Sequence, residues 1–222
     1  MKPNKKDFFI PTYIINLETR KERRKHIYEE FRNKNEFKIE IVNAVKDEIG
    51  AVGLWKSIIK IIKIAQLAKD EIILICEDDH MFTENYDKNY LFYNIAKAEK
   101  KNVELLMGGV SGFGMAVPVS HNLYWIDWYW GNQFIIIFKS FFETILNFEF
   151  KNTDQADIVL SNLTSRKMVL YPFVSIQKNF GYSDVTDRNN NNPALINNMF
   201  IKSNYKLQHI HNINLFYNDY VV

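Results

Sequence analysis

Three adjacent acidic residues interrupt an apolar stretch of the chain, ILICEDDHMF at 73–82. A run of four apolar residues leads into Glu77, Asp78 and Asp79, and apolar side chains return at Met81. Adjacent carboxylates repel one another and resist transfer out of water. We therefore expect a positive charge beside these three acids, at least while the protein functions.

The three acids offer hard oxygen ligands of the kind that Mg²⁺ and Mn²⁺ prefer. Such ions keep coordination positions open for substrate phosphates and neutralise a departing diphosphate, which predicts a nucleotide-linked substrate. The glycine-rich patterns of ATPases, kinases and dinucleotide-dependent enzymes do not occur in the sequence. A nucleotide-sugar transferase remains as the enzyme class. The alternative is that one acid caps the next helix while the others are solvated.

Alternating strand and helix patterns surround the acids and predict an α/β domain. The apolar run at 71–76 is typical of a strand that is covered on both faces. The acids then lie at its carboxyl end, where open α/β sheets bind their ligands. A capping box of Thr19 and Glu22 is expected to open the first helix. Further strands are predicted at 13–17, 37–42, 103–110, 133–138 and 168–173, and helices at 19–33, 50–69 and 154–166.

The composition excludes several classes of protein. The chain has 222 residues, of which 47% are hydrophobic and 15% aromatic, so it is not disordered and can bury a sizeable core. A formal charge of +2 gives no reason to expect a nucleic-acid partner. The single cysteine, Cys76, excludes a cysteine-rich zinc site and fits a reducing compartment. No apolar run approaches the roughly 20 residues of a membrane span, and the basic N-terminus is interpreted as the approach to the first strand.

Four segments match one known family in order and spacing. They are INLETRKERRKHI at 15–27, GAVGLWKSI at 50–58, ICEDD at 75–79 and SIQKNFGYSDVT at 175–186. Together they resemble glycosyltransferase family 25, the lipopolysaccharide and collagen galactosyltransferase group, as a divergent member. Where the family pattern has Glu, Cys and His in its second segment, this chain has Ala51, Leu54 and Ile58. The matching positions are Asn16, Arg20, Arg23, Arg24, Gly50, Gly53, Ser57, the acids, Gln177, Ser183 and Asp184.

The resemblance implies a GT-A fold, which is Rossmann-like and has a mixed, mostly parallel central sheet flanked by helices. This domain is expected over residues 1–188, with 189–222 as a C-terminal loop and tail packed on it. The implied reaction is an inverting transfer of a hexose from a UDP-sugar donor to a hydroxyl of a glycan acceptor, dependent on Mn²⁺ or Mg²⁺. The acceptor would be lipopolysaccharide or another surface glycan. We expect a cytoplasmic protein, or one at the inner face of the membrane with at most peripheral contact.

The resemblance also assigns roles to the acids and to the first helix. Asp79 is the first candidate metal ligand, and Glu77 is a second one. An arginine at the first helix can bind phosphate bidentately, although a solvated basic face is the alternative for Arg23. The substrate-binding candidates are Asn16, Arg20, Arg23, Gly53, Ser57, Glu77, Asp78, Trp128 and Asp184.

A general base must deprotonate the acceptor hydroxyl, and a carboxylate is the usual choice. Asp157 fits the family pattern and is the preferred candidate, and Asp154, three residues earlier, is the second one. The alternative for one of them is a role as the helix cap, for which Thr153 competes. His209 is a candidate third metal ligand. The spacing of His209 and His211 indicates a strand or loop, and ordinary tail residues are the alternative.

Two further segments could contribute to the site. WIDWYWGNQF at 125–134 holds three of the four tryptophans, and Trp128 is the candidate for stacking on an acceptor sugar; burial in the core is the alternative. GGVSGFG at 108–114 is expected to be a mobile loop that closes over the donor. Two other classes of protein also remain open. One is a homologue that binds a nucleotide or glycan without turnover, and the other is a two-metal phosphohydrolase or nucleotidyltransferase.

Overall fold

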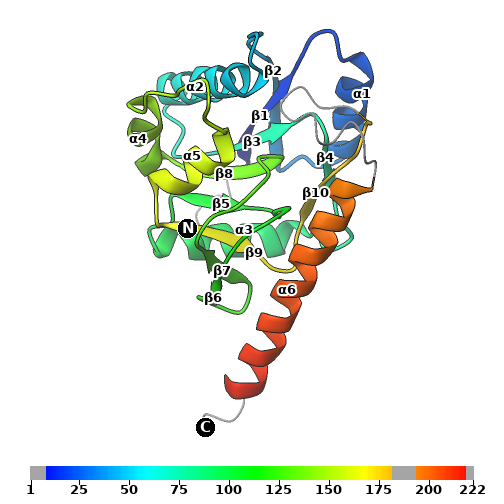
Figure 1. Cartoon of the computed structure of the whole chain (residues 1–222), viewed down its shortest axis with the longest axis vertical. Helices are drawn as coiled ribbons and strands as arrows, with labels where there is room; N and C mark the ends of the chain where they lie inside the picture. The colour runs from blue at the N-terminus through cyan, green and yellow to red at the C-terminus, as the bar shows by residue number, and fades with distance from the viewer. Residues whose placement is uncertain (1–8, 182–193, 219–222) are drawn as a thin grey trace, which may run out of the picture.

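The computed structural model describes residues 9–181 and 194–218. Within this part of the chain one large sheet forms the centre of the molecule (Figure 1). Its strands are β1 (Ile10–Asn16), β2 (Phe37–Asn43), β3 (Ile72–Glu77), β5 (Leu105–Met107), β6 (Ala116–Pro118), β7 (Leu123–Ile126), β8 (Phe134–Phe138) and β9 (Lys167–Leu170).

The strands of this sheet lie in the order β2-β1-β3-β8-β5-β9-β7-β6. β1 pairs in parallel with β2 and β3, and β5 pairs in parallel with β9. β8 is antiparallel to β3 and β5, and β7 is antiparallel to β9 and β6. Six of the eight strands therefore point in one direction. The predicted α/β fold with a mixed, mostly parallel sheet is confirmed.

Helices cover both faces of the sheet. α1 (Lys21–Glu30) and α3 (Lys88–Lys100) pack on one face, and on the other lie α2 (Gly50–Ala68), α4 (Phe142–Leu146), α5 (Ala156–Leu163) and α6 (Leu195–Asn218), with the short 3-10 turn η1 (Lys139–Phe141) before α4. Alternate residues of β3 enter the two cores: Ile73 and Ile75 face α2, while Leu74 and Cys76 face α1 and α3. The prediction that β3 is buried on both faces is confirmed.

A small second sheet continues the chain beyond the acids. β4 (His80–Phe82) follows β3 directly and pairs antiparallel with β10 (Ser175–Gln177). The register places Gln177 opposite His80. Residues about a hundred positions apart in the sequence are thereby brought to the end of β3.

The first helix begins differently from the prediction. α1 starts at Lys21 with Arg20 as the N-cap residue and has no side-chain capping bond. Thr19 lies in a turn that is closed by a hydrogen bond from Arg20 N to Leu17 O. The predicted capping box is therefore wrong, because the chain turns once more before the helix begins.

The C-terminal segment also differs from the loop and tail expected there. α6 is a helix of 24 residues, so the strand or loop predicted around His209 is wrong. Phe200, Ser203 and Leu207 recur at helical spacing and are buried against the domain. No helix in the described ranges is long and apolar enough to cross a membrane.

Candidate functional site

A cavity of about 1110 Å³, called here the first cavity, opens at the carboxyl ends of β1, β2 and β3. Because these strands are parallel, the residues that follow them meet at one edge: Leu17, Ala44 and Glu77 with Asp78 and Asp79 all line the cavity. β8 is antiparallel to β3, so the segment that leads into β8 reaches the same edge. The first turns of α5 and α6 complete the wall.

Arg23 lies among the three acids. Its Nη1 atom is 3.1 Å from Asp78 Oδ1 and 3.3 Å from Asp79 Oδ2, and the residue is only 4% exposed. Asn16 donates a hydrogen bond of 2.7 Å to the other oxygen of Asp78. A buried guanidinium thus supplies part of the positive charge that the acids require. The alternative of a solvated basic face is excluded for Arg23.

Asp79 keeps one oxygen free. Its Oδ2 accepts a hydrogen bond of 2.7 Å from Gln177, and its backbone carbonyl accepts one of 2.7 Å from the amide of Lys178. Its Oδ1 is buried and has no hydrogen-bond partner among the described residues. Burial is the main cause that raises the pKa of Asp79 to about 6, and the Gln177 hydrogen bond and the Arg23 charge oppose that rise.

Glu77 also faces the first cavity. Its carboxylate makes no hydrogen bond within the part of the chain that the structure describes. Burial is the largest cause that raises its pKa well above the usual range, followed by the charges of Asp79, Asp78 and Asp157. A cation placed among these carboxylates would stabilise their ionised forms.

The acids fit a cation that is shared with a ligand better than one held by protein alone. Within residues 9–181 and 194–218 no three His, Cys, Asp or Glu side chains are grouped to hold a metal ion. Mg²⁺ and Mn²⁺ need fewer protein ligands, because one or two carboxylates plus substrate phosphates complete their coordination. The free Oδ1 of Asp79 and the Glu77 carboxylate provide such a partial donor set.

The structure separates the two candidate bases. Asp157 lies in the first turn of α5 and lines the first cavity, and its carboxylate accepts hydrogen bonds from the amides of Gly131 (3.1 Å) and Ile158 (2.9 Å). Burial raises the pKa of Asp157, and these two hydrogen bonds oppose the rise. Asp154 precedes the helix, accepts a hydrogen bond from the amide of Lys151 at 2.8 Å, and lines a neighbouring cavity.

Gly53 and Ser57, in the segment 50–58, pack against a loop that lines the first cavity. The backbone of Gly53 passes so close to the loop after β2 that a Cβ there would lie 2.6 Å from Val45 O. The buried Ser57 hydroxyl donates to Gly53 O and accepts from Val45 N, each at 2.8 Å. Ser57 therefore positions the loop of Val45, Lys46 and Asp47, which lines the first cavity, while Gly53 and Arg20 line it directly.

Other candidates lie away from the first cavity. Trp128 does not line it and packs against Trp130, with ring centroids 4.9 Å apart. His209 is exposed on α6, outside the lining residues, with its Nε2 2.9 Å from the hydroxyl of Tyr205. Asp184 and Ser183 fall outside the described residues, so their placement stays a prediction.

The glycine-rich segment at 108–114 is a packed wall in the structure. Val110 and Phe113 are buried in the core, and Ser111 lines the first cavity. Gly112 and Trp130 form an antiparallel bridge that fixes the segment to the strand-end loop. This packing does not fit the mobile, lid-like loop that the glycines predicted.

Several residues of the first cavity were missed by sequence reasoning: Lys46, Asp47, Trp130, Asn132, Gln155 and Gln177. Lys46 and Asp47 lie in the loop that follows β2, so the rule that ligands bind at the carboxyl ends of parallel strands could have found them. Trp130 belongs to the aromatic run from which only Trp128 was chosen. Gln177 was matched to the family pattern and was not assigned a role.

The comparisons with known proteins add little beyond the fold. No protein-family model and no curated protein matches the chain. Among solved structures, A197 from STIV is 14% identical, with a TM-score of 0.51 and a match that covers 76% of this chain and 85% of that one. This similarity supports the α/β fold alone.

Two structures of UDP-glucose pyrophosphorylase also match. The apo form is 13% identical with a TM-score of 0.46, and the complex with UDP-glucose is 12% identical with a TM-score of 0.45. Each match covers 86% of this chain; it covers 82% of the apo chain and 81% of the chain in the complex.

Proposed function

We propose that this chain is a divergent relative of glycosyltransferase family 25 that transfers a hexose from a UDP-sugar to a hydroxyl of a glycan, with Mn²⁺ or Mg²⁺ as cofactor. One observation carries the proposal. Glu77 and Asp79, at the carboxyl end of β3, share the first cavity with the half-buried carboxylate of Asp157. Acids suited to a diphosphate-bound cation thus face a carboxylate suited to general-base catalysis.

Each side chain around the donor has a distinct task in this proposal. Asp79 Oδ1 and Glu77 would hold the cation, which supplies charge neutralisation to the departing diphosphate when bound. Gln177 fixes the orientation of Asp79 through its hydrogen bond to Oδ2. Arg23 lowers the repulsion between Asp78 and Asp79, so its guanidinium serves the acids more directly than the substrate. Arg20, which lines the cavity, is the candidate for a phosphate.

Asp157 would act as the base. It removes the proton of the acceptor hydroxyl while the acceptor oxygen forms its bond to the anomeric carbon and the bond to the UDP oxygen breaks. Its raised pKa suits a base that works near neutral pH. The two amide hydrogen bonds hold the carboxylate in one orientation and leave it on the cavity wall.

Calorimetric titration of UDP tests the proposal, first with Mn²⁺ and then with EDTA, with ADP and GDP as controls. We expect UDP to bind in the presence of Mn²⁺, and we expect this binding to be lost when EDTA is added. Asp79→Asn should remove that binding, whereas Glu84→Gln, which neutralises an exposed acid, should not. The donor site would be refuted if the native chain bound no nucleotide, or if Asp79→Asn bound UDP as tightly as the native chain does.

One observation favours a second candidate, a nucleotide-binding homologue without turnover. Arg23 and Asn16 already satisfy Asp78, and Arg23 with Gln177 satisfies one oxygen of Asp79. The need for a cation is thereby reduced. Release of UDP from UDP-galactose or UDP-glucose separates the two candidates, because a pure binding protein releases none.

The two-metal enzymes are less compatible with the structure. They would need further acids near Glu77 and Asp79. Glu104 is instead bonded to Thr164 and Arg166, and Asp127 accepts hydrogen bonds from three backbone amides. Neither lines the first cavity.

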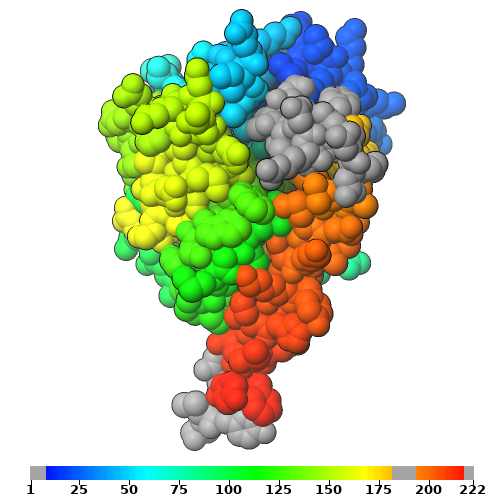
Figure 2. Space-filling model, in the orientation of Figure 1, coloured from blue at the N-terminus to red at the C-terminus, as the bar shows by residue number. Residues whose placement is uncertain are grey.

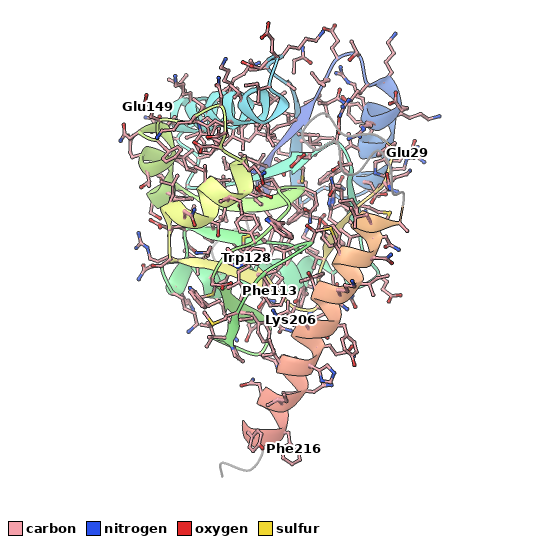
Figure 3. The ribbon with its side chains drawn as sticks, in the orientation of Figure 1. Glu29, Phe113, Trp128, Glu149, Lys206 and Phe216 are labelled. Carbon is pink, nitrogen blue, oxygen red and sulfur yellow. The ribbon has the colours of Figure 1, made fainter. Side chains whose placement is uncertain are left out.

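The outward face of α6 supports peripheral contact with an anionic membrane. α6 extends beyond the rest of the described structure, with Phe216 near its far end (Figures 2 and 3). Residues 195–218 contain no Asp or Glu, and Lys202 is exposed on α6. The ammonium of Lys206 instead turns toward the domain, where it donates to the backbone carbonyls of Phe113 and Gly114. Such a face suits the boundary between lipid headgroups and acyl chains. The exposed apolar side chains on it are Ile201, Tyr205, Ile213, Phe216 and Tyr217.

A further inference from the structure

A second cavity, of about 640 Å³, adjoins the first. Trp130 and Gln155 line both cavities, so the two cavities border on each other at these residues. Two consecutive residues of α5 line different cavities: Asp157 lines the first and Ile158 lines the second. A molecule in the second cavity would therefore lie next to the candidate base.

Trp130 forms an exposed and fixed aromatic surface between the cavities. The residue is 41% exposed. Its ring packs on the backbone of Gly112, where a Cβ would lie 2.6 Å from the indole, and against the ring of Trp128. Its amide donates to Gly112 O at 3.0 Å and its carbonyl accepts from Ser111 N at 2.9 Å. The indole is thus held in place while part of its surface stays open.

Polar groups surround this aromatic surface. Thr153, Asp154 and Asn162 line the second cavity together with apolar residues of α5 and with Phe148. The hydrogen bond from Lys151 N fixes Asp154 through Oδ2, and Oδ1 accepts no hydrogen bond within the described ranges. An aromatic wall with a few polar groups around it is complementary to a pyranose ring, which has apolar C–H faces and a rim of hydroxyls.

We propose that the second cavity is the acceptor subsite, in which Trp130 stacks on a pyranose ring and Asp154 and Asn162 bind its hydroxyls. The inference rests on the proposed function, because it takes the first cavity as the donor site. Gln155 borders both cavities and precedes Asp157 by two residues, so a ring bound in the second cavity would lie close to the candidate base. Trp130 is then a specificity-determining residue for the acceptor and Trp128 supports it from behind.

Saturation-transfer NMR with methyl β-D-galactopyranoside and methyl β-D-glucopyranoside tests the subsite. The full chain should bind at least one of them, and Trp130→Ala should weaken that binding about tenfold, which corresponds to about 1.4 kcal/mol. Trp130→Phe should retain part of the affinity because it keeps a ring. Tyr93→Ala, which removes an exposed aromatic side chain from α3, should change nothing.

A second pair of variants guards against misfolding of Trp130→Ala. Asp154→Asn and Asn162→Ala alter side chains at the cavity rim, and each should weaken glycoside binding while the melting temperature stays native. Unchanged glycoside binding in all of these variants would overturn the proposal. So would the absence of any methyl glycoside binding by the native chain.

Calorimetry of UDP on the same samples separates this inference from the proposed function. We expect the affinity for UDP to stay native in Trp130→Ala. A loss of UDP binding without loss of glycoside binding would assign Trp130 to the nucleobase and overturn the inference. If the native chain binds no UDP but loses glycoside binding with Trp130→Ala, the donor proposal fails and the sugar subsite stands.

Discussion

The backbone amide of Gly131 donates a hydrogen bond of 3.1 Å to Oδ2 of Asp157. Gly131 follows Trp130 and has a φ of +104°, a conformation that residues with a Cβ rarely adopt. The bond joins the loop that carries Trp130 to the first turn of α5. The aromatic surface and the candidate base are therefore positioned relative to each other by one backbone contact.

Gly131→Ala is expected to lower transfer activity more than its cost in stability explains. A Cβ would strain the backbone by about 1–2 kcal/mol at this φ, and relief of that strain would move the amide away from Asp157. Gln133 Oε1, which would lie 2.8 Å from the Cβ, is the end of a side chain that can shift. Thermal unfolding and kcat are to be measured together.

Gly181→Ala is the matched control for this substitution. Gly181 also has a positive φ, of +82°, but a Cβ there meets no atom within 4 Å. Gly181→Ala should therefore lose stability through backbone strain alone and keep the native kcat. Equal loss of kcat in both variants would contradict the role given to the Gly131 amide.

Asp157→Asn and Asp154→Asn should differ in kind. Asp157→Asn removes the proposed base and should lower kcat about 100-fold to 10,000-fold, while UDP binding stays native. Asp154 lines the second cavity, so Asp154→Asn should raise KM for the acceptor and leave kcat near native. Steady-state kinetics with varied acceptor separates the two effects. Similar kcat values in the two variants would exclude Asp157 as the base.

The family pattern favoured Asp157 over Asp154, but the sequence could not settle the choice, for a local reason. They lie three residues apart, and helix boundaries read from sequence are uncertain by more than one residue. α5 begins only at Ala156, so Asp157 is carried by its first turn while Asp154 stays in the preceding loop. One turn of error in a helix start decides which cavity an aspartate faces.

The strand that carries the acids was predictable, whereas their partners were not. A run of apolar residues that ends in three acids specifies β3 and its carboxyl end without any distant information. The contact of Arg23 with Asp78 joins residues 55 positions apart, and that of Gln177 with Asp79 spans 98. Such pairs depend on how α1 and β10 pack on the sheet. The choice between Trp128 and Trp130 depended in the same way on the path of one loop.

Arg23→Gln is expected to destabilise the protein strongly. It removes a buried guanidinium and leaves Asp78 and Asp79 uncompensated, a change that costs about 3–5 kcal/mol. Arg24→Gln, at the half-buried neighbouring position, should have a small effect. Denaturant unfolding measures both. Mn²⁺ should raise the melting temperature of Arg23→Gln more than that of the native chain, because it replaces the missing charge. A native melting temperature in Arg23→Gln would contradict the role of this arginine.

Glu77→Gln should change the pH dependence of stability. The pKa of Glu77 is raised in the folded state by burial and by the charges of Asp79, Asp78 and Asp157. Its contribution to stability is therefore present at low pH and is lost as the pH rises through the folded pKa. The variant should melt higher than the native chain at about pH 8 and almost equally at about pH 5.

The control for the pH experiment is Glu84→Gln, because Glu84 is exposed and lies outside the first cavity. Its melting curve should follow that of the native chain at every pH. If the melting temperature of Glu77→Gln also follows that of the native chain at every pH, ionisation of Glu77 does not destabilise the fold. The electrostatic role given to Glu77 would then be wrong.

The orientation of α6 leads to a prediction about lipid binding. Phe200 and Leu207 are buried against the domain, while Tyr205 and Phe216 are exposed; the side chain of Lys206 lies beside Phe113 (Figure 3). Replacing Tyr205 and Phe216 by Ser should therefore leave the fold intact and reduce co-sedimentation with phosphatidylglycerol vesicles. Phosphatidylcholine vesicles should bind the native chain weakly at low salt, since they carry no net charge. Tyr93→Ser, on helix α3, is the control and should co-sediment with the vesicles as the native chain does. If Tyr93→Ser reduces co-sedimentation as much as the double variant, the contact is not made through α6.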